Sequence, residues 1–174
     1  MSIWKKNANI LTLKSKWVDI YCDSYSVDKE TIEYWTVQRP SSLIILTIHN
    51  EDFILLKNNF RPGINELAID FPGGRLENNN LFENAKKILQ RELSLEENDY
   101  ILSLLSDTGF PSDSSFSSQK VYYGIAKIKM DVILEEETFM RYNISSEREE
   151  LFKKLTCLQC RCGAFEYIMQ HTKG

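Results

Sequence analysis

The sequence predicts a mixed α+β domain with a largely antiparallel sheet. Its 174 residues suit one domain that buries its own core. Short segments rich in β-branched and aromatic residues come first, one helical segment interrupts them, and helical segments end the chain. No internal repeat and no interdomain linker is visible. This order of elements is typical of strands and helices that share a single core.

The composition excludes several classes of protein. Hydrophobic residues make up 43% and charged residues 26%, as in an ordinary soluble domain. The net charge of −4 argues against a nucleic-acid-binding surface. No apolar segment follows the N-terminal residues, and the longest apolar run, Leu43–Leu46, is too short to span a bilayer. We therefore expect a cytoplasmic protein whose partners include neither nucleic acid nor a membrane.

The first half of the chain contains mainly strand signals. Loose alternation and β-branched or aromatic residues indicate strands, and Pro, Gly and Asn interrupt them. The expected elements are one or two strands within 10–27, a strand at 33–37, a break at 39–42, a buried strand at 43–48, a turn at 49–52, its hairpin partner at 53–56, a loop at 58–63 and a short strand near 66–70.

The second half alternates helical and strand signals. Ser146 and Glu149 have the S-x-x-E spacing of a capping box, which predicts a helix start. The expected elements are a helix at 81–97, a strand at 100–105, a Ser/Gly/Pro-rich loop at 107–118, a long strand at 120–130, an acidic loop at Glu135–Glu137, a helix starting near Ser146 and a last helix at 164–171.

Two carboxylates fall on the apolar face of the helix expected at 81–97. Stepping ~100° per residue from Leu81 places Glu92 at roughly 20° and Glu96 at roughly 60°, within the apolar arc. Unpaired ions on a buried face cost several kcal/mol each, so a partner is needed. One alternative is a structural network with an arginine, for which Arg91, Arg75 and Arg61 are the candidates. The other is a magnesium site, because hard cations bind carboxylate oxygens and recruit phosphates.

Three cysteines are clustered near the C-terminus. Cys157, Cys160 and Cys162 form the segment CLQCRC, whereas Cys22 is distant in sequence. A Cys-x-x-Cys pair binds zinc or carries out redox chemistry, but a complete zinc site needs a fourth ligand, for which Cys22 or His171 is a candidate. The incomplete ligand set favours reduced thiols at a helix end, and the metal and redox alternatives remain open.

The stretch from Pro72 to Asn98 resembles a Nudix box, whose family pattern is G-x5-E-x7-R-E-U-x-E-E-x-G-U, with U an aliphatic residue. Glu83 and Arg91-Glu92-Leu93 match this pattern without a gap. Gly74 matches the leading glycine, although eight residues instead of five separate it from Glu83. The upstream segment 60–74 is similar to the Y-R-P … L-E-L-P-A-G segment of the ADP-ribose pyrophosphatase branch.

The box departs from the family pattern at two positions. In this register Leu95 replaces the first glutamate of the E-E pair, and Glu96 keeps the second. Asn98 replaces the closing glycine, and asparagine tolerates the left-handed conformation of a helix C-cap. A one-residue bulge would instead bring Glu96 and Glu97 into the pair. We expect a regular helix, in which Glu92 and Glu96 remain as the metal ligands.

The resemblance implies a Nudix-like α/β/α sandwich with a mixed, largely antiparallel sheet. It implies one domain over 1–174, with N-terminal strands at 1–38 that form a homodimer and a Nudix core at 39–174. The implied activity is metal-dependent hydrolysis of a nucleoside diphosphate linked to another moiety, such as ADP-ribose or a nucleotide sugar, with Mg²⁺ or Mn²⁺ as cofactor. Leu95 supports an alternative, a catalytically impaired domain that binds nucleotides or proteins.

The resemblance also implies roles for individual residues. Glu92, Glu96 and the Gly73 carbonyl would hold the metal, and Arg91 would orient Glu83. The general base would come from the acidic loop, with Glu136 as its central residue. The implied substrate contacts come from four further residues, namely Arg61, Asp70, Gly74 and Phe110.

Overall fold

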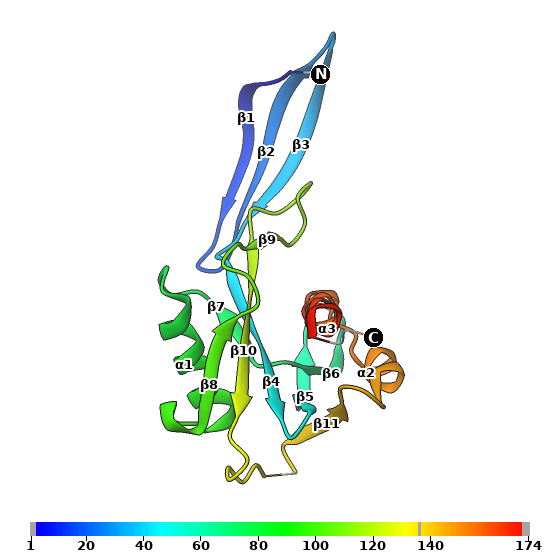
Figure 1. Ribbon diagram of the computed structural model, residues 1–174. Coiled ribbons are helices and arrows are strands. Elements are labelled where there is room, and N and C mark those ends of the chain that lie inside the picture. Colours follow the sequence, from blue (N-terminus) through cyan, green and yellow to red (C-terminus); the bar gives the residue numbers. More distant parts are fainter. Residues whose placement is uncertain (1–2, 136, 172–174) are drawn as a thin grey trace. The chain divides into compact units, whose positions relative to one another are not determined.

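The computed structural model describes residues 3–135 and 137–171 of the chain (Figure 1). The chain divides into two compact units. The first unit contains the chain up to Ser41 together with Phe110–Lys120, and the second contains Ser42–Gly109 and the chain from Val121 onward. Among the described residues, no helix is long and apolar enough to cross a membrane.

The first unit is built on a three-stranded antiparallel sheet. Its strands lie in the order β1 (Trp4–Lys14), β2 (Asp19–Val27) and β3 (Glu30–Gln38). The segment 110–120 belongs to the same unit and contains β9 (Phe110–Pro111). It is joined to β3 by a hydrogen bond of 2.6 Å from the Tyr34 hydroxyl to the carbonyl of Ser115. The strands predicted for this part of the sequence are therefore confirmed.

The second unit contains the main sheet and the α-helices. The central strands follow the order β11-β5-β4-β10-β8, in which β10 is parallel to β4 and the other neighbours are antiparallel. Its elements are β4 (Ser42–His49), β5 (Asp52–Arg61), β6 (Glu66–Asp70), β7 (Gly73–Arg75), α1 (Leu81–Leu93), the short 3₁₀-helix η1 (Glu97–Asp99), β8 (Tyr100–Leu104), β10 (Lys120–Ile128), β11 (Phe139–Asn143), α2 (Arg148–Lys154) and α3 (Leu158–His171).

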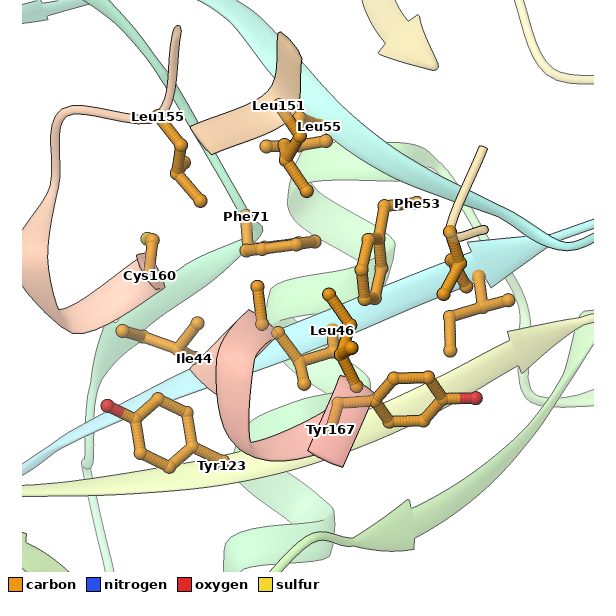
Figure 2. Packing of buried hydrophobic residues seen from close by; sticks show 14 of the residues in the cluster. Ile44, Leu46, Phe53, Leu55, Phe71, Tyr123, Leu151, Leu155, Cys160 and Tyr167 are labelled. Atoms are coloured by element: carbon orange, nitrogen blue, oxygen red, sulfur yellow. The ribbon is translucent and has the colours of Figure 1, made fainter. Parts of the chain in front are cut away.

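Helices cover both faces of this sheet. Alternate residues of β4 point to opposite faces, so Ile44 and Leu46 belong to one hydrophobic core and Leu43 and Ile45 to the other. The first core includes side chains of α2 and α3 (Figure 2), and the second includes those of α1. The predicted α/β/α sandwich with a mixed, largely antiparallel sheet is confirmed.

The central helix ends earlier than predicted. Helix α1 stops at Leu93, and Ser94 adopts the left-handed conformation with φ 55° and ψ 29°. The next turn starts at Glu96, whose backbone N–H donates a 2.7 Å hydrogen bond to the Asp99 carboxylate. This side-chain bond competes with helix continuation. The predictions of a helix to residue 97 and of a left-handed C-cap at Asn98 are therefore wrong.

Three smaller predictions also need correction. Strand β5 extends to Arg61, into the segment predicted as a loop at 58–63. Helix α3 begins at Leu158, six residues before the predicted start at 164. Ser146 does not cap α2, whose N-cap is Glu147, because the Ser146 hydroxyl donates to Asn143 instead.

Candidate functional site

Glu92 is held between the end of helix α1 and strand β7. The Arg91 guanidinium donates a 2.5 Å hydrogen bond to Oε1 of Glu92, and the Gly73 N–H donates a 3.1 Å bond to Oε2. Arg91 also donates to the carbonyl of Gly73 at 3.2 Å. Both carboxylate oxygens of Glu92 therefore already have partners, and the partner of Oε1 is the positively charged Arg91 guanidinium.

Two glycines allow β7 to lie this close to its neighbours. A Cβ atom at Gly73 would lie 3.0 Å from the Leu43 carbonyl oxygen of β4, and one at Gly74 would lie 3.3 Å from the Arg91 guanidinium. Either contact is tighter than ordinary packing. Gly74, predicted as a substrate contact, thus makes room for the Arg91 side chain.

Glu92 lines a pocket of about 320 Å³ at the end of α1. Its lining residues include the acidic Asp99 and Glu135 and the apolar Leu95 and Phe139. The predicted acidic loop therefore does contribute to the same pocket as the helix. Glu136, the residue predicted as the general base, lies outside the described residues.

Two carboxylates predicted to act with Glu92 have other partners. Glu83 lies in the first turn of α1 and pairs with Lys86 at 3.3 Å, so Arg91 orients Glu92 instead of Glu83. Glu96 lies beyond the helix end, is exposed and accepts a 3.3 Å bond from Gln90. The predicted alignment of Glu92 and Glu96 on one helical face is wrong, because Ser94 ends the helix between them.

The predicted substrate residues are dispersed. Arg61 and Asp70 form an ion pair, with a 2.7 Å hydrogen bond from Nε of Arg61 to Oδ2 of Asp70. Asp70 is only 2% exposed, so its carboxylate is not presented to a solvent-borne ligand. Phe110 belongs to the first unit, where it is exposed.

The residues predicted as a Nudix box do not fit a magnesium ion as they are arranged. Magnesium at phosphate-handling sites is bound by one or two carboxylates together with waters and substrate phosphates, so at least one carboxylate oxygen must be directed at the ion. Both oxygens of Glu92 have partners, and the Gly73 carbonyl accepts from Arg91. Among the described residues, the only group of three potential ligand side chains that lie close together is Asp70, Cys157 and Cys160, which does not include Glu92.

The left-handed residue Ser94 indicates a different register for the box. If Ser94 occupies the position of the closing glycine, Gly73 falls on the leading glycine with the five-residue spacing that the pattern requires. Leu89 and Leu95 then fill the two aliphatic positions, and both are buried in the second core. The positions of the four glutamates are occupied, in chain order, by Asn79, Ile88, Arg91 and Glu92. In this alignment with the family pattern, Glu92 stands at one of the four glutamate positions and Arg91 at the position before it.

Comparisons with known proteins support the fold. No family model and no curated protein matches the sequence. Among solved structures, the chain is similar to one described as an ADP compounds hydrolase, with a TM-score of 0.74 and 14% sequence identity. The match covers 95% of this chain and 94% of that chain. The chain has a Nudix-like fold.

Proposed function

We propose that this chain is a Nudix-fold domain that binds a nucleoside diphosphate compound without metal-dependent hydrolysis. The observation that carries the proposal is the contact of Arg91 with Glu92 and Gly73. A fixed guanidinium stands beside the one remaining box carboxylate, where a hydrolase of this class would hold exchangeable cations. The proposed function is therefore the alternative implied by Leu95 in the sequence, a catalytically impaired domain that binds nucleotides. The contacts of Arg91 support it.

A guanidinium retains part of the role of a metal ion. It is permanently charged, and its planar set of donors matches the oxygens of a phosphate. The Arg91 side chain is 59% exposed, so it offers donors to a ligand besides those used by Glu92 and Gly73. Val132 and Phe139 provide an apolar wall, and Asp99 and Glu135 provide acceptors for ribose hydroxyl groups.

The proposal predicts that ligand binding is independent of divalent cations. In calorimetric titrations, ADP-ribose should bind with the same affinity, within about twofold, in Mg²⁺ and in EDTA. Arg91→Ala should weaken binding about tenfold or more, because it removes a charge-assisted hydrogen-bond donor to phosphate.

Lys86→Ala provides a control matched in charge and helix. Lys86 pairs with Glu83 at 3.3 Å and with Glu97 at 3.0 Å, and it has no contact with Glu92 in the described interactions. It should change the affinity by less than twofold. A strict requirement for Mg²⁺, or an equal loss in the Lys86→Ala and Arg91→Ala variants, would contradict the proposal.

The second candidate function is metal-dependent hydrolysis of the same class of compound. It is favoured by the presence of Glu135 and Glu92 in one pocket, and by the similarity in fold to an ADP compounds hydrolase. The titrated samples distinguish the two functions, because hydrolysis would release a nucleoside monophosphate. If Mg²⁺ or Mn²⁺ causes release of a nucleoside monophosphate and Glu92→Gln abolishes that release, the function is hydrolysis and not binding alone.

We further propose that the first unit forms a homodimer, as the family resemblance implies. Its sheet has β1 at one edge and exposes several large apolar side chains on that strand, namely Trp4, Ile10, Leu11 and Leu13. Light scattering should give the mass of two chains. Leu11→Asp combined with Leu13→Asp should give one chain, because charges on an apolar interface oppose association.

Ile101→Asp is the control for this prediction. Ile101 is 66% exposed and belongs to the second unit, so its replacement should leave the dimer intact. A single-chain mass for the unmodified protein would refute the homodimer.

A further inference from the structure

A second cluster of reactive side chains lies apart from the Glu92 contacts. The thiols of Cys157 and Cys160 and a carboxylate oxygen of Asp70 lie within 4.8 Å of one another. Cys160 and Asp70 are 3% and 2% exposed, whereas Cys157 is partly exposed. The cluster therefore combines one accessible thiol, one buried thiol and one buried carboxylate.

Local structure gives the two cysteines different positions on helix α3. Cys157 directly precedes the helix, and its carbonyl accepts the first helical hydrogen bond from the N–H of Arg161 at 2.9 Å. Cys160 lies in the first turn, three residues later. The unpaired N–H groups at a helix start stabilise a negative charge there, which favours a thiolate at Cys157.

The pKa values of the two thiols differ in the direction that the helix start favours, with the lower pKa at Cys157. A hydrogen bond from the Cys160 thiol lowers the pKa of Cys157 to about 6. The same hydrogen bond, with burial, raises the pKa of Cys160 well above its ordinary value. The titratable groups that face Cys157 from neighbouring strands are Arg61, Asp70 and Tyr123. The helix start and these pKa directions therefore both favour the thiolate at Cys157 and the protonated thiol at Cys160.

Asp70 is placed to take the proton of Cys160 once Cys157 is in a mixed disulfide and no longer accepts the hydrogen bond of that thiol. The Sγ atom of Cys160 lies 3.7 Å from Oδ1 of Asp70, while Arg61 holds the other oxygen, Oδ2, at 2.7 Å. Arg61 thereby acts as a positioning residue that leaves Oδ1 directed at the thiol. Figure 2 shows Cys160 among the apolar side chains near Phe71 and Leu155, where a carboxylate is a rare neighbour.

We propose that Cys157 and Cys160 form a redox-active dithiol that reduces disulfides of small thiols such as glutathione disulfide. The Cys157 thiolate attacks one sulfur of the disulfide, forms a mixed disulfide and releases one thiolate. Asp70 accepts the proton of Cys160, whose sulfur then attacks Sγ of Cys157. This step forms the Cys157–Cys160 disulfide and releases the second thiolate, which takes up the proton. Two electrons pass from the dithiol to the substrate disulfide.

Zinc binding is the competing use of these side chains. The cluster supplies three ligand side chains, and zinc in structural sites takes four. Of the two candidates for a fourth ligand, His171 stacks on Tyr167 with a ring separation of 4.1 Å, and the group found among the described residues includes neither His171 nor Cys22. The incomplete ligand set and the unequal exposure of the two thiols both favour exchange over a structural metal site.

The exchange is tested by oxidising the reduced full chain with glutathione disulfide and mapping its thiols by alkylation and mass spectrometry. The expected product contains a Cys157–Cys160 disulfide. Cys160→Ser should stop at a mixed disulfide with glutathione on Cys157, and Cys157→Ser should form neither product. Cys162→Ser, which alters an exposed thiol outside the cluster, should behave as the unmodified protein.

Two further measurements separate exchange from a merely structural role. The alkylation rate of Cys157 should rise with pH along a titration curve with its midpoint near 6 and level off well above it, because the thiolate is the reactive form. Asp70→Asn should leave the first step unchanged and slow the second at least tenfold, so that mixed disulfide accumulates. If this variant does not fold, the Cys160→Ser result decides alone. The proposal is overturned if glutathione disulfide leaves both thiols reduced, or if one zinc per chain survives dialysis against a chelator and blocks their alkylation.

Discussion

Leu95→Glu is expected to lower the free energy of unfolding by about 3–5 kcal/mol, because it buries an unpaired carboxylate. In the register read directly from the sequence, the same change restores a missing metal ligand. Leu95 is 3% exposed and packs in the second core with Leu89 and Leu93. The structure therefore assigns position 95 to packing, so that the variant should gain no Mg²⁺-dependent hydrolysis.

Urea denaturation of the variant and of Leu95→Met tests this expectation. Methionine conserves the volume and the apolar character of leucine, so this control should lose less than about 1.5 kcal/mol. Nucleotide hydrolysis is measured on the same samples. If the Leu95→Glu protein keeps its stability and hydrolyses ADP-ribose with Mg²⁺, position 95 is a glutamate position of the box. The alignment that places Ser94 at the closing glycine would then be wrong.

Phe53→Ala is expected to be as damaging, with a loss of about 3–5 kcal/mol of stability. Phe53 is fully buried in the first core and makes edge-to-face contacts with Phe71 and Tyr167, at ring separations of 5.3 and 5.6 Å. Its removal leaves a cavity where β5, the segment after β6 and helix α3 meet (Figure 2). In a domain of this size, such a loss lowers Tm by roughly 10 °C.

Phe165→Ala is the matched control, because it removes the same atoms from a side chain of α3 that is 56% exposed. It should change the stability by no more than about 0.5 kcal/mol. Scanning calorimetry of both variants measures the difference. Equal melting temperatures would show that the first core does not limit the stability of the fold.

The architecture could be predicted from the sequence. The apolar residues of 43–48 predicted a buried strand, and β4 contributes to both cores. The apolar face predicted for the helix at 81–97 is likewise buried, since Ala85, Ile88 and Leu89 of α1 lie in the second core. These patterns are reliable because each depends on neighbours within a few residues, whose geometry the backbone period fixes. Glu92 was also identified from sequence as a residue of the candidate site.

Long-range packing sets where helix α1 ends and what surrounds the reactive groups. Ser94 and Asn98 are both compatible with a helix end by local preference, but Leu93 and Leu95 are both buried in the second core, and a continuing helix would place them about 200° apart. The helix therefore ends at the first of these two positions. Asp70 and Cys160 lie 90 residues apart in the chain, so no local spacing predicts their contact. Arg61 and Asp70 were expected at a nucleotide, but their ion pair lies beside the thiols. In the pairing of β5 with β6, Arg61 is opposite Glu66 and Asp70 is opposite Leu56, so strand register does not predict this contact either.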